Sequence, residues 1–240
     1  MQLLLQRKKT KKKKVNNTTH ILCLETATTN CSVALSINGK ATVLKEDNSL
    51  QYSHAESLHT YIEAVLNQVG IDKQQLNAIA VSKGPGSYTG LRIGVSAAKG
   101  LCYALDIPLL AIPTLEALAV QAQATSGIVI PMIDARRMEV YSAIYDRAGK
   151  QLRETQAQVL DENAFARYLE QGTTHFIGNG VAKFAAICNH KNAVFLDDKL
   201  PSAREMAVLA QARFEQAAFE DLAYFEPYYL KDFILGGKPK

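Results

Sequence analysis

The strongest constraint on the fold is an order of predicted elements that occurs twice along the chain. Residues 21–24 form a short apolar run, typical of a strand buried on both faces, and residues 31–37 alternate as a half-buried strand does. Asn38-Gly39 favours a two-residue hairpin turn because both positions accept positive φ, and residues 40–46 return as a third strand. The first copy therefore opens with antiparallel hairpins.

Helices and strands alternate after these three strands. A capping box at residues 53–56 begins a helix with apolar side chains at helical spacing, which ends near Gly70. The rest of this copy, in chain order, is a strand at 78–82, a glycine-rich turn, a helix to about Leu105, a strand at 108–112 and a helix from a Thr114 cap through Ala124.

The second copy repeats the order of elements without repeating the residues. Hairpins followed by right-handed crossovers give a mixed sheet with helices on both faces, so the duplication predicts an α/β fold of two similar lobes facing each other across a cleft. The elements of the second copy are strands at 128–133, 139–145 and 150–160, a helix capped by Asp161 that carries Phe165, Tyr168 and Leu169, a strand at 176–177, a helix at 181–188, a strand at 193–196 and a helix from a second capping box at 202–205 through Ala218.

These elements divide the chain into two lobes and two tails. The predicted parts are a basic N-terminal tail at 1–19, a first lobe at 20–113 completed by a C-terminal helix at about 202–231, a smaller second lobe at 114–201 and a C-terminal tail at 232–240.

Charge is distributed unevenly between the tail and the lobes. Seven of the 27 basic residues and none of the 23 acidic ones lie in residues 1–19, so the rest of the chain carries a net charge of −3 although the whole carries +4. The basic tail could contact tRNA or an anionic membrane, or be the product of an upstream start or a solvated leader. With 48% apolar residues and no apolar run of about 18–20 residues, the chain is expected to be globular and not membrane-spanning.

Motifs for covalent or metal chemistry are missing from the sequence. Four cysteines without CxxC spacing predict reduced thiols in a cytoplasmic protein, and no serine lies in a GxSxG motif. His54 and His59 lie on different sides of a helix, so they do not form a metal-ligand pair. Glu25 and Asp134 end the first strand of each copy and could hold Mg²⁺ through water, but no third ligand is evident. We therefore assign no catalytic residue and no metal ligand.

The glycine-rich turn at 84–90 is the most specific stretch of the sequence. A turn between a strand and a helix N-terminus offers backbone N–H groups to an anion, and Arg92 falls in the first helical turn if Thr89 is the cap. The turn is not a Walker motif, and its glycines could instead let the helix lie close to the sheet. The candidate nucleotide or anion site comprises Thr26, Gly84, Gly86, Ser87, Thr89 and Arg92.

The helix that follows this turn is rich in small residues. Two glycines inside a helix cost about 1 kcal/mol each relative to alanine, so close packing against the sheet or against a partner helix should offset them. Both explanations remain open. The candidate partner surface comprises Leu58, Tyr61, Ile62, Gly94, Ala97, Ala98, Leu101 and Ala104.

Several stretches of the sequence resemble the TsaB (YeaZ) family. They are residues 21–35, with Leu24-Glu25-Thr26, residues 52–56, the whole of 84–94, residues 133–141 and the ending Pro227-Tyr228-Tyr229-Leu230-Lys231. The similarity covers about residues 20–231. It implies an actin-like, ribonuclease-H-type fold of two lobes, which agrees with the duplicated order.

The resemblance also implies a role in making N6-threonylcarbamoyladenosine at position 37 of tRNA. In this family a paralogous partner, TsaD, carries the chemistry, the ATPase TsaE joins the complex, and TsaB pairs with TsaD through first-lobe helices that correspond to residues 53–69 and 89–105. The same surface supports a homodimer of the isolated chain. The one cofactor candidate is ATP or ADP with Mg²⁺ at the interface of the complex.

The sequence departs from actin-like ATPases at two places, and two other functions remain open. Actin-like ATPases have Asp where Glu25 stands, and Gly178-Asn179-Gly180 is at most a remnant of an adenosine site. The chain could still be a sugar-kinase-like ATPase, with phosphate in the glycine-rich turn and Asp134 positioning a nucleophile, or a peptidase, since relatives have been labelled glycoproteases.

Overall fold

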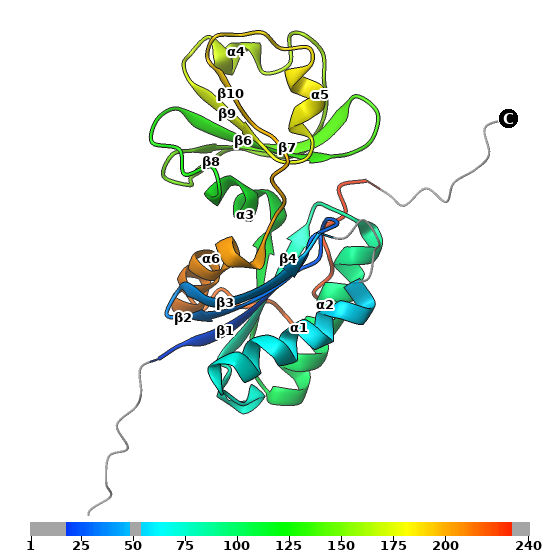
Figure 1. Cartoon of the computed structure of the whole chain (residues 1–240), viewed down its shortest axis with the longest axis vertical. Coiled ribbons are helices and arrows are strands. Elements are labelled where there is room, and N and C mark those ends of the chain that lie inside the picture. Colours follow the sequence, from blue (N-terminus) through cyan, green and yellow to red (C-terminus); the bar gives the residue numbers. More distant parts are fainter. Residues whose placement is uncertain (1–17, 49–53, 232–240) are drawn as a thin grey trace, which may run out of the picture.

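The computed structural model describes residues 18–48 and 54–231, and it contains two lobes of the same topology (Figure 1). The first sheet has the strand order β3-β2-β1-β4-β5 and the second has the order β10-β9-β6-β7-β8. Read from the third strand of each copy, both sheets follow one pattern, with two antiparallel hairpins and then parallel neighbours. The prediction of a duplicated α/β fold is confirmed.

The first lobe consists of one sheet covered on both faces. Its elements are β1 (His20–Glu25), β2 (Cys31–Ile37), β3 (Lys40–Asp47), α1 (His54–Val69), the short 3₁₀ helix η1 (Lys73–Gln75), β4 (Ala78–Gly84), α2 (Tyr88–Leu105) and β5 (Leu109–Pro113). Asn38 and Gly39 both have positive φ, which confirms the hairpin turn between β2 and β3. The capping box predicted at 53–56 lies partly outside the described residues.

The second lobe repeats this plan with shorter helices. Its elements are α3 (Thr114–Val120), β6 (Ile128–Asp134), β7 (Glu139–Asp146), β8 (Gln151–Val159), α4 (Ala166–Leu169), β9 (Thr174–Ile177), α5 (Val181–Ala185) and β10 (Ala193–Leu196). The chain then returns to the first lobe with α6 (Ala203–Glu215), which packs on the first sheet.

Helices separate the two sheets and bury their inner faces. α1 and α2 cover one face of the first sheet, α6 packs on the other face, and α3 lies between the two sheets (Figure 1). In the second lobe four phenylalanines, among them Phe176 and Phe184, fill the face below α4 and α5. The β1–β2 turn and the start of α2 therefore lie at the end of the first sheet that faces the second lobe.

Several predicted helix boundaries are wrong. Thr114 does not cap α3, because its hydroxyl accepts a hydrogen bond from the Gly84 amide instead, and α3 ends at Val120 rather than at Ala124. The C-terminal helix ends at Glu215, where Ala217 adopts a left-handed conformation, and so it reaches neither Ala218 nor residue 231. These ends depend on tertiary contacts that no local pattern reports.

Two further caps differ from the prediction. Phe165 precedes α4 in a left-handed conformation, and the Asp161 carboxylate accepts from the Asn163 amide without capping the helix. Ser202 does cap α6, but it accepts from Arg204, and no reciprocal bond from Glu205 is formed.

Candidate functional site

The glycine-rich turn joins β4 to α2 at the end of the first sheet. Ser87 is the N-cap of α2, and its hydroxyl accepts a 3.3 Å hydrogen bond from the Gly90 amide, so the prediction of Thr89 as the cap is wrong. Arg92 consequently lies beyond the first three helical positions. Its guanidinium donates to the Tyr88 hydroxyl at 2.8 Å and lies 5.2 Å from the centre of that ring.

The β1–β2 turn packs directly against this glycine-rich turn. A Cβ atom on Gly90 or Gly94 would come closer to Thr26 than the 3.0 Å that real Cβ atoms keep. Thr26 is fully buried, and its hydroxyl donates to the Gly90 carbonyl at 2.8 Å. The Ser87 amide in turn donates to the Ala27 carbonyl at 2.7 Å. Close packing against the first hairpin thus explains these glycines without a ligand.

A C-terminal strap, residues 221–231, lies over the other side of the turn. The Tyr228 amide donates to the Lys83 carbonyl at 2.6 Å, and a Cβ atom on Gly84, whose φ is +111°, would lie 2.5 Å from the Tyr228 carbonyl. Lys99 of α2 donates to two strap carbonyls, and the Tyr229 ring packs 4.8 Å from the Tyr88 ring. No local pattern predicted that the strap would lie here.

Of the six predicted anion-site residues, two remain at the surface. Thr89 and Arg92 are exposed, whereas Thr26 and Gly84 are buried and Gly86 and Ser87 are half-buried against the β1–β2 turn. The six predicted residues lie near one another, but the hydroxyls of Thr26 and Ser87 already form hydrogen bonds within the chain.

The two acidic residues at equivalent strand ends have different environments. Burial raises the pKa of the Glu25 carboxyl to about 7, although Oε1 accepts from the Ala27 amide at 2.6 Å. Glu25 Oε2 is buried and has no hydrogen-bond partner among the described residues. The Asp134 carboxylate forms a 2.7 Å ion pair with Lys183, a residue that no sequence signal singled out.

These acidic residues do not fit a magnesium site. One carboxyl is deeply buried and readily protonated, and the other is neutralised by a lysine. Within residues 18–48 and 54–231, no group of three or more His, Cys, Asp or Glu side chains could hold a metal ion. All four cysteines are free and buried, and burial raises the pKa of Cys23 and Cys102 to about 12.

The predicted partner surface on α1 and α2 is divided between core and exterior. Leu58, Ile62, Gly94 and Ala98 are buried under the two helices, so their inclusion in a surface is wrong. Tyr61, Ala97 and Leu101 are half-buried and Ala104 is exposed. The outer side of α2 also presents Gly100, which has nothing within 4 Å of its Cβ position, and Tyr103, which is 84% exposed.

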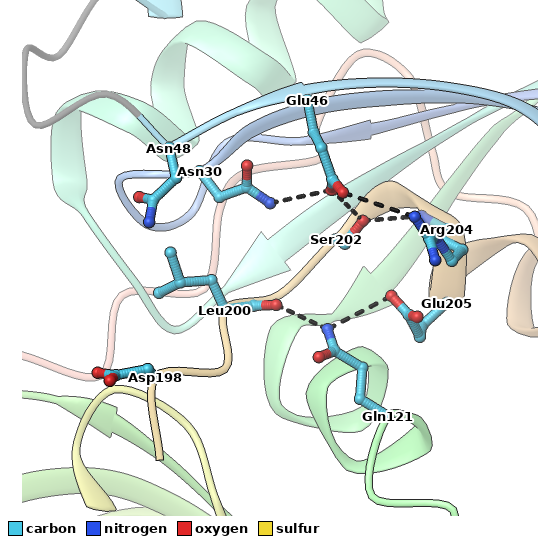
Figure 2. A pocket seen from close by; sticks show the side chains of 9 residues that line it. All are labelled: Asn30, Glu46, Asn48, Gln121, Asp198, Leu200, Ser202, Arg204 and Glu205. Atoms are coloured by element: carbon cyan, nitrogen blue, oxygen red, sulfur yellow. Dashed lines mark hydrogen bonds and ion pairs between the residues drawn. The ribbon is translucent and has the colours of Figure 1, made fainter. Parts of the chain in front are cut away.

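A polar cavity of about 300 Å³ lies where the chain passes between the lobes (Figure 2). The Gln121 amide, just after α3, donates to the Leu200 carbonyl at 2.6 Å and to Glu205 at 3.3 Å. Ser202 donates to Glu46 at 2.7 Å, and burial raises the pKa of Glu205. These contacts link the two inter-lobe connections to each other and to β3. Sequence reasoning did not find this cavity, because its side chains come from four separate segments.

No helix in the described part of the chain is long and apolar enough to cross a membrane.

Comparisons with known proteins name two families, TsaD by its family model and TsaB by similar proteins. A family model described as TsaD, tRNA N6-adenosine threonylcarbamoyltransferase, matches residues 48–237. The tRNA threonylcarbamoyladenosine biosynthesis protein TsaB of Haemophilus influenzae is 31% identical over 225 residues, which are 88% of this chain and 93% of the relative. TsaB of Escherichia coli is 31% identical over 220 residues, covering 88% and 94%.

A solved structure agrees with these relatives. YeaZ from Pseudomonas aeruginosa superimposes with a TM-score of 0.77 at 28% identity, and the match covers 88% of this chain and 100% of that one.

Proposed function

The chain belongs to the TsaB family, also named YeaZ, and from this premise we propose that it takes part in the biosynthesis of N6-threonylcarbamoyladenosine at position 37 of tRNA. The names of these relatives support this role. The match extends over nearly the whole length of the two relatives, so it includes both lobes.

Within that pathway the chain acts as the partner of a TsaD-like catalytic subunit. The observation that carries this proposal is the outer side of α2, where Gly100 and Ala104 are exposed beside the exposed ring of Tyr103. An exposed glycine in an 18-residue helix costs about 1 kcal/mol relative to alanine, and no contact within the described chain repays it. A partner helix that packs closely on this side would do so.

The partner subunit, in this proposal, supplies the groups that make and break bonds. The environments of Glu25 and Asp134 support this division, because a buried carboxyl and a lysine-paired carboxylate are poorly suited to orient a phosphate or a nucleophile. The kinase-like alternative requires turnover of ATP by the isolated chain. The proposed complex also contains a TsaE-like ATPase, and ATP or ADP with Mg²⁺ binds at its interface. The isolated chain forms a homodimer through the α2 surface.

Reconstitution of the modification reaction tests the function. The TsaD-like and TsaE-like subunits, the enzyme that makes the threonylcarbamoyl adenylate, and an unmodified tRNA are combined with and without this chain. We expect modified adenosine to accumulate only in its presence. An unchanged yield without the chain would refute the function, and steady ATP turnover by the chain alone would favour the kinase-like alternative.

A substitution on α2 tests the partner surface. Gly100→Arg places a long cation on the outer side of α2 without a clash inside the lobe, since nothing lies within 4 Å of its Cβ position. Val208→Arg on α6 is the matched control, because Val208 is also exposed but lies on the opposite face of the first sheet. Co-purification with the TsaD-like subunit should be lost for Gly100→Arg alone. Equal binding by both variants would exclude this surface.

A further inference from the structure

The turn between β6 and β7 holds two arginines in an unusual backbone conformation. Arg136 and Arg137 have φ values of 68° and 49°, in the left-handed region that favours glycine or asparagine. Asp134 accepts from the Arg136 amide at 2.6 Å. Lys183 lies against the same turn and donates at 2.7 Å to Asp134 and to the carbonyls of Arg137 and Glu139. These hydrogen bonds therefore fix the backbone conformation of the β6–β7 turn.

The same contacts leave the two arginines available to an external anion. Lys183 neutralises Asp134, and the adjacent Glu139 is paired with Lys231 of the strap. Both arginines are exposed, and neither guanidinium has an ion pair or hydrogen bond within residues 18–48 and 54–231. These two positive charges therefore lie on a part of the chain that is negatively charged overall, since residues 20–240 carry a net charge of −3.

Aromatic rings and a third arginine continue this surface onto the first lobe. Lys231 contacts Glu139, two residues from Arg137, and Tyr229 lies two residues before Lys231 in the strap. Tyr229 packs on Tyr88, whose ring also faces the Arg92 guanidinium. Figure 1 shows the strap, in red, passing α2 toward the second lobe. We call Arg136, Arg137, Tyr229 and Arg92 the inter-lobe basic surface.

We propose that the inter-lobe basic surface binds the sugar-phosphate backbone and an unpaired base of RNA. Arginines bind phosphates through several donors, and a tyrosine ring such as that of Tyr229 can stack on a base that is not in a helix. That the RNA is tRNA rests on the proposed function. RNA fits better than a free nucleotide because the cations are spread over two lobes and line neither the polar cavity at the start of α6 nor the pocket between α4 and the residues that follow α5.

Binding of an unmodified tRNA transcript to the full chain, followed by fluorescence anisotropy at several KCl concentrations, tests the proposal. Arg136→Ala/Arg137→Ala is compared with Arg147→Ala/Lys150→Ala, which removes two exposed cations from the β7–β8 turn of the same sheet. All variants retain residues 1–17, so any RNA binding by those residues is common to them. We expect the first variant to bind on the order of tenfold more weakly and to lower the slope of log K against log salt by about 1–2, and the control to change neither.

A third variant tests the aromatic part of the surface. Tyr229→Leu should weaken binding several-fold while leaving the salt slope unchanged, since a stacked ring releases no counterions. Thermal unfolding verifies that each variant is folded. Equal losses in the Arg136/Arg137 variant and its control, or no loss in either, would overturn the proposal. So would Mg-ATP that binds the chain through these arginines and displaces the tRNA. None of these outcomes depends on the modification assay, so failure of the proposed function remains distinguishable.

Discussion

Two glycines on one helix should respond in opposite directions to the same substitution. Gly94 and Gly100 both lie within α2, but Gly94 is buried against Thr26 whereas Gly100 faces solvent. Alanine at Gly94 would place its methyl group against Thr26 Oγ1, which is fully buried and donates to the Gly90 carbonyl. Alanine at Gly100 meets nothing within 4 Å.

The expected free energies follow from these contacts. Replacing an interior helical glycine by alanine gains about 1 kcal/mol from backbone entropy, and Gly100→Ala should keep most of that gain. At Gly94 the same gain is opposed by overpacking of about 1–3 kcal/mol and by displacement of a buried hydrogen bond that contributes about 1 kcal/mol. Gly94→Ala should therefore lose about 1–3 kcal/mol, and the two variants should differ by about 2–4 kcal/mol.

Urea unfolding followed by circular dichroism measures both variants. The midpoint should shift down for Gly94→Ala and slightly up for Gly100→Ala at an unchanged m-value. A double-mutant cycle with Thr26→Ala removes the hydroxyl and methyl groups that the new Cβ would meet, so we expect Thr26→Ala to cost less in the Gly94→Ala background than in wild type.

Two results would refute this reasoning. If Gly94→Ala is as stable as Gly100→Ala, the close approach of α2 to Thr26 is not a constraint. If Thr26→Ala costs the same in both backgrounds, any loss at Gly94 has another cause. A folded Gly94→Ala protein that merely fails to bind the TsaD-like subunit would instead restore Gly94 to the partner surface.

Three further changes have expected outcomes. Burial raises the pKa of Glu25 from 4.5 to about 7, so the native state binds this proton more tightly than the unfolded state does. The resulting contribution to stability is complete below about pH 4.5 and is lost as the pH rises through about 7. The loss amounts to about 3 kcal/mol. The difference in unfolding free energy between wild type and Glu25→Gln should therefore change by about 3 kcal/mol between pH 4 and pH 8, and a constant difference would contradict this expectation. Ser87→Ala removes the N-cap of α2 and should cost about 1 kcal/mol in urea unfolding, whereas Thr89→Ala should cost little, and the reverse order would restore Thr89 as the cap. Lys183→Met leaves Asp134 without its ion pair and should lower stability by about 2–3 kcal/mol in thermal unfolding, and an unchanged melting temperature would show that the β6–β7 turn is held by other contacts.

Much of the fold could be predicted from local patterns. Hairpins signalled by alternation and by Asn38-Gly39, and helices signalled by apolar spacing, are properties of neighbouring residues, and the duplicated order followed from them. Helix ends were predicted less well. Thr114 has the side chain of a cap, but its hydroxyl accepts from the Gly84 amide, and only the folded sheet brings Gly84 there.

The candidate site was predicted only in part. The glycine-rich turn was found from its composition, yet composition could not distinguish an anion-binding turn from one packed on a neighbouring hairpin. Lys183 and Tyr229 were not found as site residues, because each acts through a residue far away in the sequence, Asp134 and Tyr88 respectively.

The sequence alone determined the periods of the strands and helices, the duplicated order and, through residues 84–94, the family. It also determined that Gly94 and Gly100 point in different directions, because the helical period sets the angle between them. Only the tertiary structure decided which of the two faces the sheet. That choice depends on what packs against the helix, and the packing partner, Thr26, lies more than sixty residues earlier in the chain.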